Sequence, residues 1–164
     1  MAEVKTLDEL FLDTLKDVYF AENKIVETLP KMHEAAKSLQ LKDAFMKHLA
    51  ETKLHVERLE QVFGIIGEEP EEKTCDAILG ITNEGAEIMG EYEGSPALDA
   101  GLLAAAQAVE HYEMSRYGTL RTWALELGLN DAAGLLQTTL DEEQATDLAL
   151  TAIATSVVNQ KAEG

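Results

Sequence analysis

Two histidines and a glutamate lie close together in the segment HLAETKLHVE, residues 48–57. His48, Glu51 and His55 are separated by three or four positions, a spacing that places side chains on the same or adjoining faces of a helix. Imidazole nitrogen and carboxylate oxygen together suit iron or manganese. Apolar side chains share the same stripe, so these polar groups are expected at a face that should be buried. We interpret the segment as a candidate metal site inside a helical bundle.

Carboxylates recur on the apolar stripes of three other segments. Each has apolar neighbours at helical spacing and is expected to point inward near the middle of its helix. They are Glu22, Glu110, Glu113, Glu143 and Asp147. An ionised carboxylate inside a bundle is costly unless it is paired or coordinates a metal, and the local lysines and arginines are too few to pair them all. Together with Glu51, these side chains carry six negative charges, which two trivalent ions would balance.

Four long segments with helical periodicity must position these groups. Thr6 and Glu9 form a capping box before the first segment, and Ser95 followed by Pro96 signals the start of the third. Pro30 should kink the first helix or split off its last two turns. We expect helices at about 7–38, 41–66, 75–92, 96–127 and 131–158.

The lengths of the connections predict how these helices are arranged. Short connections join the first long helix to the second and the third to the fourth, which favours two antiparallel hairpins. The connection between the hairpins is long and contains its own short helix, as a crossover along the bundle would. The sequence therefore predicts an all-α, ferritin-like four-helix bundle with a short crossover helix, in a single domain of residues 1–164.

The composition narrows the classes of partner. Hydrophobic residues make up 46% of the 164-residue chain and aromatic residues 5%, a balance typical of helical globular proteins. A formal net charge of −18 disfavours nucleic acid and anionic membrane surfaces. No uninterrupted apolar stretch is long enough for a spanning helix. The single Cys75 and the absence of a secretory signal at the N-terminus predict a cytoplasmic protein.

The ligand spacing departs from the usual pattern for two-metal carboxylate bundles. Such bundles carry one glutamate on each of two helices and Glu-x-x-His on the other two. Here Leu54 lies three positions after Glu51, and Thr146 lies three positions after Glu143. The histidine ligand would be His55 or His48, a choice that these residues leave open, and Asp147 would replace the second histidine.

Four stretches of the chain resemble the YciE/YciF family of bacterial ferritin-like stress proteins. The stretches are LPKM, HLAETKLHVERLEQVF, AAAQAVEHYEMSRYGTLRTWA and LDEEQATDLALTAIA, and the likeness runs from about Thr6 to Asn159. The resemblance implies a cytoplasmic homodimer with a ferritin-like bundle, an association with stress responses and a two-metal centre.

The resemblance also bears on the site residues. Five glutamates match places that bear ligands in ferritin-like helices: Glu22, Glu51, Glu110, Glu113 and Glu143. Glu110-x-x-Glu113 looks like the extra glutamate arrangement of rubrerythrin. No cysteine cluster for a rubredoxin-type iron site follows, so the electron path of rubrerythrin itself is missing.

Two functions fit these observations. The first is a metal-binding protein with two iron ions, or two manganese ions, held by carboxylates and reacting with dioxygen or peroxide. Iron oxidation, peroxide detoxification and a catalase-like manganese cycle are its possible outcomes, and Glu113 or Glu143 is the candidate for a carboxylate that changes its mode of binding. The second is a non-enzymatic, dimeric stress protein whose polar residues are a degenerate metal site. Metal analysis of the purified protein separates the two.

Overall fold

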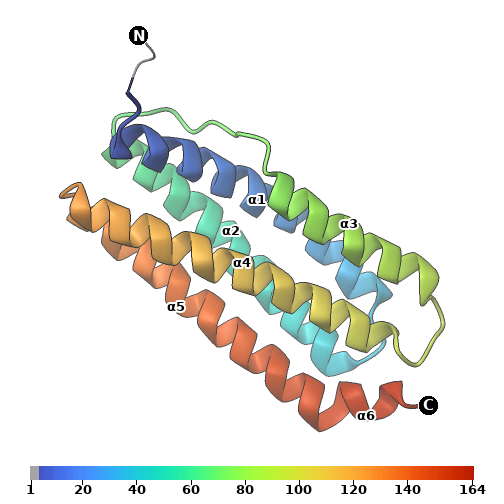
Figure 1. Ribbon diagram of the computed structural model, residues 1–164. Coiled ribbons are helices and arrows are strands. Elements are labelled where there is room, and N and C mark those ends of the chain that lie inside the picture. The colour runs from blue at the N-terminus through green and yellow to red at the C-terminus, as the bar shows by residue number, and fades with distance from the viewer. Residues whose placement is uncertain (1–3) are drawn as a thin grey trace.

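The computed structural model describes residues 4–164, and helices dominate this part of the chain. In chain order these are α1 (Leu7–Ala35), α2 (Leu39–Ile65), α3 (Asp76–Glu91), α4 (Leu98–Glu126), α5 (Asn130–Ile153), a π-helical turn (Ala154–Val158) and α6 (Asn159–Ala162). The helices α1 and α2 form one hairpin, α4 and α5 form the other, and α3 lies along α1 and α4 (Figure 1). The expectation of an all-α, ferritin-like bundle with a crossover helix is confirmed.

The connection from α2 to α3 is held against α1. It runs back along the outside of the bundle (Figure 1). The Lys73 backbone N–H donates to the Lys16 carbonyl at 3.2 Å, and the Asn23 side chain donates to the Glu72 carboxylate at 2.9 Å. This acidic segment is therefore anchored, and it fixes where α3 begins.

The end of α1 differs from the expected position. The helix α1 continues through Pro30 without a break and ends at Ala35. The helix ends there because the backbone N–H groups that follow do not continue the helical hydrogen bonds. Those of Lys37 and Ser38 donate to the Asp99 carboxylate instead, at 2.8 and 2.6 Å. Those contacts tie the first hairpin to the start of α4.

The start of α4 and the end of α5 also differ from the expected positions. The helix α4 begins at Leu98, because Ser95 accepts the Ala97 N–H at 3.1 Å in the turn before it. The α-helical part of α5 ends at Ile153 and passes into the π-helical turn.

Buried apolar side chains form two clusters, one toward each end of the bundle. Phe45 belongs to the first cluster and Phe11 to the second. Along α1, Val18 lies in the second cluster and Ile25 in the first, with the buried Glu22 between them. The other long helices change cluster at the same level. A buried polar layer therefore separates two apolar layers at the middle of the bundle.

Along residues 4–164, no helix combines the length and the apolar character needed to span a bilayer.

Candidate metal centre

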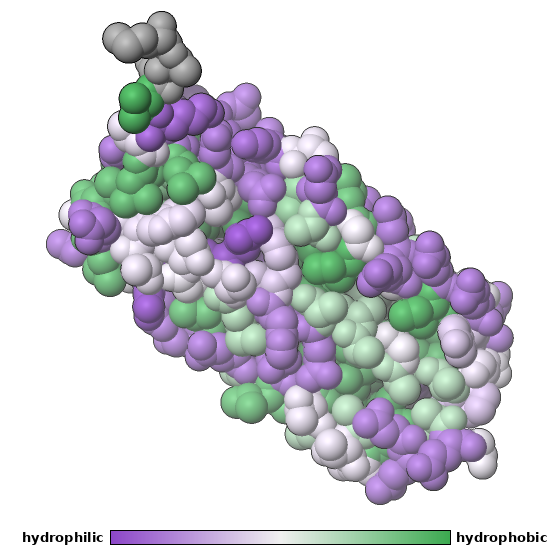
Figure 2. Space-filling view, in the orientation of Figure 1, coloured by the Kyte–Doolittle hydropathy of each residue, from purple (hydrophilic) through white to green (hydrophobic). Residues whose placement is uncertain are grey.

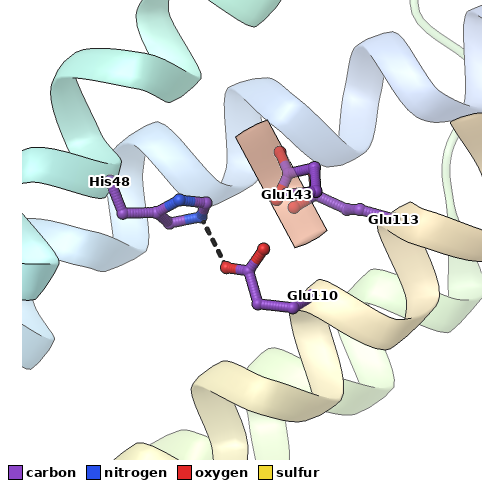
Figure 3. A group of neighbouring side chains, drawn as sticks. All are labelled: His48, Glu110, Glu113 and Glu143. Carbon is purple, nitrogen blue, oxygen red and sulfur yellow. Dashed lines mark ion pairs between the residues drawn. The ribbon is translucent and has the colours of Figure 1, made fainter. Parts of the chain in front are cut away.

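Six ionisable side chains meet in the polar layer, and each is at most 4% exposed. The helix α1 contributes one of them, α2 two, α4 two and α5 one. They are Glu22, His48, His55, Glu110, Glu113 and Glu143. One group of ligand atoms combines His48 with the carboxylates of α4 and α5 (Figure 3). A second group combines Glu22, His55 and Glu143, and within each group the atoms lie within 4.8 Å of one another.

Glu143 belongs to both groups, so the two candidate ion positions are neighbours. Nδ1 of His55 lies 2.8 Å from Oε1 of Glu143 and 3.4 Å from Oε1 of Glu22. Nε2 of His48 lies 3.0 Å from Oε1 of Glu110, the pair joined by the dashed line in Figure 3. Donor atoms from all four long helices therefore converge at one level.

Most of these atoms face one another without forming hydrogen bonds. In the described residues, ten buried side-chain nitrogen and oxygen atoms have no hydrogen-bond partner, and nine of them belong to the six side chains. They include both oxygens of Glu113, both oxygens of Glu143 and both ring nitrogens of His48. Buried polar atoms without partners are rare in folded proteins and point to an ion or ligand. Carboxylate oxygens and imidazole nitrogens are ligands that suit iron and manganese.

Without a cation, the layer keeps several protons. Burial raises the pKa of Glu110 to about 12, and the charge of Glu143 adds to the effect. Burial and the same neighbour raise the pKa of Glu113 well above its usual value. Burial alone would lower the pKa of His55, but the Glu22 charge and the nearby Glu143 carboxylate outweigh it and raise the pKa to about 11. Metal ligation needs these groups deprotonated, so binding releases protons.

Burial also acts on His48 and Glu143. Burial lowers the pKa of His48 and keeps its ring neutral, as metal ligation requires. Burial would raise the pKa of Glu143, but the close approach of Glu110 and of the His55 ring lowers it to about 2. Glu143 thus stays ionised beside the protonated Glu110 and His55.

These shifts predict how the stability of the metal-free protein depends on pH. Glu110, Glu113 and His55 have native pKa values above their unfolded values, so their contribution is lost as the pH rises. The lowered pKa values of His48 and Glu143 change stability only below about pH 7. The melting temperature of the metal-free protein should therefore fall between about pH 7 and pH 9. Thermal melts in chelator check this, and a melting temperature that rises over the same window would contradict it.

Two expected ligands lie outside both groups. Glu51 is partly exposed between α2 and α5, where Lys47 lies 3.6 Å away and the Thr146 hydroxyl donates to it at 3.3 Å. At about 100° per residue, Glu51 is rotated about 60° from His48 on α2. His48 and His55 are only about 20° apart and both point inward. The sequence left open whether His48 or His55 lies at the site, and the structure places both in the polar layer.

Asp147 also lies at the edge of α5. It accepts from Gln107 at 3.3 Å and lies 3.1 Å from Nε2 of the exposed His111. At four residues from Glu143 it is rotated about 40° away from the interior. Four buried carboxylates remain instead of six, and their charge matches two divalent ions rather than two trivalent ones.

Threonines occupy two places where the usual pattern has metal ligands. Thr52 lies three residues before His55, Thr146 lies three residues after Glu143, and both are buried. The hydroxyl of Thr52 donates to the His48 carbonyl at 2.7 Å. Where the usual pattern has Glu-x-x-His, α2 therefore carries Thr-x-x-His and α5 carries Glu-x-x-Thr. His48, one turn before Thr52, supplies a second imidazole in place of the missing ligands.

A pair of charged residues outside the layer holds His55, and no sequence pattern predicted this contact. Nε2 of His55 lies 2.8 Å from Glu142, and Arg58 donates to both oxygens of Glu142 at 2.6 and 2.8 Å. The hydrogen bond from Arg58 is the main cause of the lowered pKa of Glu142. An ionised carboxylate behind a histidine fixes the ring so that its other nitrogen faces the metal. Here that nitrogen is Nδ1, which faces Glu22 and Glu143.

Tyr117 closes the layer on the side of α4. Its hydroxyl donates to Oε1 of Glu22, and burial raises its pKa well above the usual value. The tyrosine is fully buried and belongs to the second hydrophobic cluster. It supplies a bound proton at the boundary between the carboxylates and the apolar core.

A family model described as "Domain of unknown function (DUF892)" matches residues 6–163. Protein YciF of Escherichia coli (strain K12) is 42% identical over 164 residues, covering 98% of this chain and 97% of YciF. The crystal structure of the E. coli stress protein YciF matches with a TM-score of 0.91 at 40% identity, over 96% of this chain and 99% of that one.

Two further solved structures have the same fold. YcfI of Rhodopseudomonas palustris has a TM-score of 0.88 and 44% identity, over 92% of this chain and 96% of that one. A protein from Xanthomonas campestris pv. campestris str. ATCC 33913 has a TM-score of 0.72 at 17% identity over 96% of each chain, a likeness of fold alone.

Proposed function

Since the chain belongs to the DUF892 family and is 42% identical to YciF, we propose that it is a metal-binding stress protein with a two-iron carboxylate centre. The centre would react with dioxygen or peroxide. Manganese is the alternative metal, because the same nitrogen and oxygen ligands suit both. We also propose that the protein acts as a cytoplasmic homodimer, as the resemblance to the YciE/YciF family implies.

One observation carries the proposal. Nine buried ligand-type atoms without hydrogen-bond partners gather at one level of the bundle, and one glutamate belongs to both of the groups that they form. A bundle that used these residues only for structure would leave several polar groups unsatisfied at a cost of about 1–3 kcal/mol each. A pair of divalent ions removes that cost and balances the four carboxylates.

The assignment of ligands follows the two groups. His48, Glu110 and Glu113 would hold one ion, Glu22 and His55 the other, and Glu143 would contact both. The bound metal would supply the electrons that reduce dioxygen or peroxide.

The surrounding residues would control the protons and the water around the centre. Glu142 keeps the His55 ring oriented, and Tyr117 keeps a proton at Glu22. The apolar clusters above and below the layer keep bulk water away from the carboxylates, which strengthens their interaction with a cation.

A second function has its own support. Thr52 and Thr146 fill two places that carry ligands in the usual pattern, which favours a bundle with a degenerate metal site and a purely structural role in stress. In that case the purified protein would hold no stoichiometric metal.

An anaerobic titration separates the two functions. Fe(II) added to metal-free protein should bind tightly until about two ions per chain are taken up, the number in two-metal carboxylate sites. Admission of air should then produce the near-ultraviolet absorption of protein-bound ferric iron. Weak, non-saturating binding, with ferric hydroxide precipitating as in protein-free buffer, would contradict the proposal.

A further inference from the structure

Two small cavities that share lining residues lie under the crossover helix, between α1, α3 and α4, and α2 also lines the inner one. Each encloses about 20 Å³, enough for one water-sized molecule. Thr28, Met32, Thr82 and Val109 line both cavities. The inner cavity reaches the metal layer, and the outer one extends between partly exposed side chains of α3. Together they form a short path from beneath α3 to the candidate centre.

Away from its inner end, the lining of this path offers almost nothing to a polar molecule. The two threonines are the polar residues that both cavities share, and their hydroxyls already donate to backbone carbonyls. Thr28 donates to the Lys24 carbonyl and Thr82 to the Ile78 carbonyl, each at 2.8 Å. Small cavities with apolar walls stay dry and accept apolar atoms or molecules.

The inner cavity ends at two buried polar side chains of the metal layer. His48 and Glu110 line it and are 4% and 1% exposed. Both ring nitrogens of His48 and Oε2 of Glu110 have no hydrogen-bond partner. A molecule in the inner cavity would therefore touch the proposed ligands of one ion directly.

A glycine is among the residues that line the outer cavity. Gly85 lies on the buried side of α3, and a Cβ atom there would be 3.6 Å from the Ala105 side chain. Figure 2 shows a green, apolar band over the first half of α4, beside α3. The surroundings of the path are thus apolar from the surface inward, although the chain as a whole is strongly acidic.

We propose that these cavities are the route by which dioxygen reaches the metal centre. Dioxygen is small, uncharged and apolar, and it fits both the volume and the lining. Peroxide would have to give up its hydrogen bonds to water and would meet mostly apolar walls, so it is disfavoured on this route. The route rests on the proposed function, because it leads to the proposed ligands His48 and Glu110.

Noble-gas crystallography tests the route without any metal. Crystals of the metal-free protein under xenon or krypton pressure should show gas atoms in both cavities. In Thr82→Leu a larger side chain fills the junction, and the gas peaks should disappear. Thr122→Leu is the matched control, because Thr122 is exposed on α4 and makes the same type of backbone hydrogen bond. Wild-type crystals without gas in either cavity would overturn the route.

Kinetics of the iron-loaded protein supply the second readout. Thr82→Leu should slow oxidation of bound Fe(II) by dioxygen about tenfold, a change in barrier of about 1.4 kcal/mol. The Fe(II) affinity of Thr82→Leu should match that of the wild type. Thr122→Leu should match the wild type in both Fe(II) affinity and oxidation rate. An unchanged rate with dioxygen, or an equal slowing with peroxide, would overturn the route and leave the proposed function intact. A protein that binds no iron would overturn the proposed function, whatever the gas occupancy.

Discussion

Replacing Glu143 with glutamine is expected to remove most of the metal from the purified protein. Glu143 belongs to both ligand groups, so its loss should weaken the binding of both ions. The affinity should fall by more than the 10–100-fold that is typical when only an outer partner of a ligand is lost. Metal analysis after dialysis should find about two ions per chain in the wild type and far fewer in Glu143→Gln.

The matched control for this variant is Glu57→Gln, an exposed glutamate on α2. It should keep the wild-type metal content. Metal-free Glu143→Gln should melt below the temperature of the metal-free wild type, because it removes the ionised carboxylate that lies 2.8 Å from the protonated, buried His55. A Glu143→Gln variant that folds and retains two ions would contradict the shared role of Glu143.

Metal binding is expected to raise the melting temperature strongly. At a free metal concentration 100 times the dissociation constant, each site adds about 2.7 kcal/mol to the free energy of unfolding. For a chain of this size, 1 kcal/mol corresponds to about 2–4 °C. Two filled sites should therefore raise the melting temperature by about 10–20 °C. Scanning calorimetry with and without anaerobic Fe(II) or Mn(II) measures the shift.

Magnesium serves as the control cation in these melts, because it favours oxygen ligands and keeps its own water shell. It should give a much smaller shift than Fe(II) or Mn(II). A metal-free bundle whose melting temperature does not move with any of the three would favour the purely structural role.

The bundle could be predicted from the sequence because its signals are local. The capping box at Thr6 is present, with the Thr6 N–H donating to Glu9 at 2.7 Å, and the stripes of apolar residues follow the buried faces of the long helices. The boundaries that differed depend on distant contacts. The end of α1 is set by Asp99, which lies about 60 residues further along the chain.

The site could be predicted only in part. Sequence spacing shows which face of a helix a side chain lies on, but it does not show whether that side chain points to the centre or to the margin of the face. Spacing placed Glu22 and the two glutamates of α4 correctly at the interior. It could not separate Glu51 and Asp147 from their inward-facing neighbours, since those differ by about 40–60° of rotation. The contacts of Glu142 with Arg58 and His55 depend on how α2 and α5 pack, which no single helix pattern contains.

Anomalous diffraction from crystals soaked anaerobically in Mn(II) or Fe(II) tests the central claim most directly. We predict two peaks inside the bundle, one among His48, Glu110, Glu113 and Glu143 and the other among Glu22, His55 and Glu143. A map without peaks in the polar layer, or with peaks only on exposed carboxylates such as those of residues 68–72, would contradict the account.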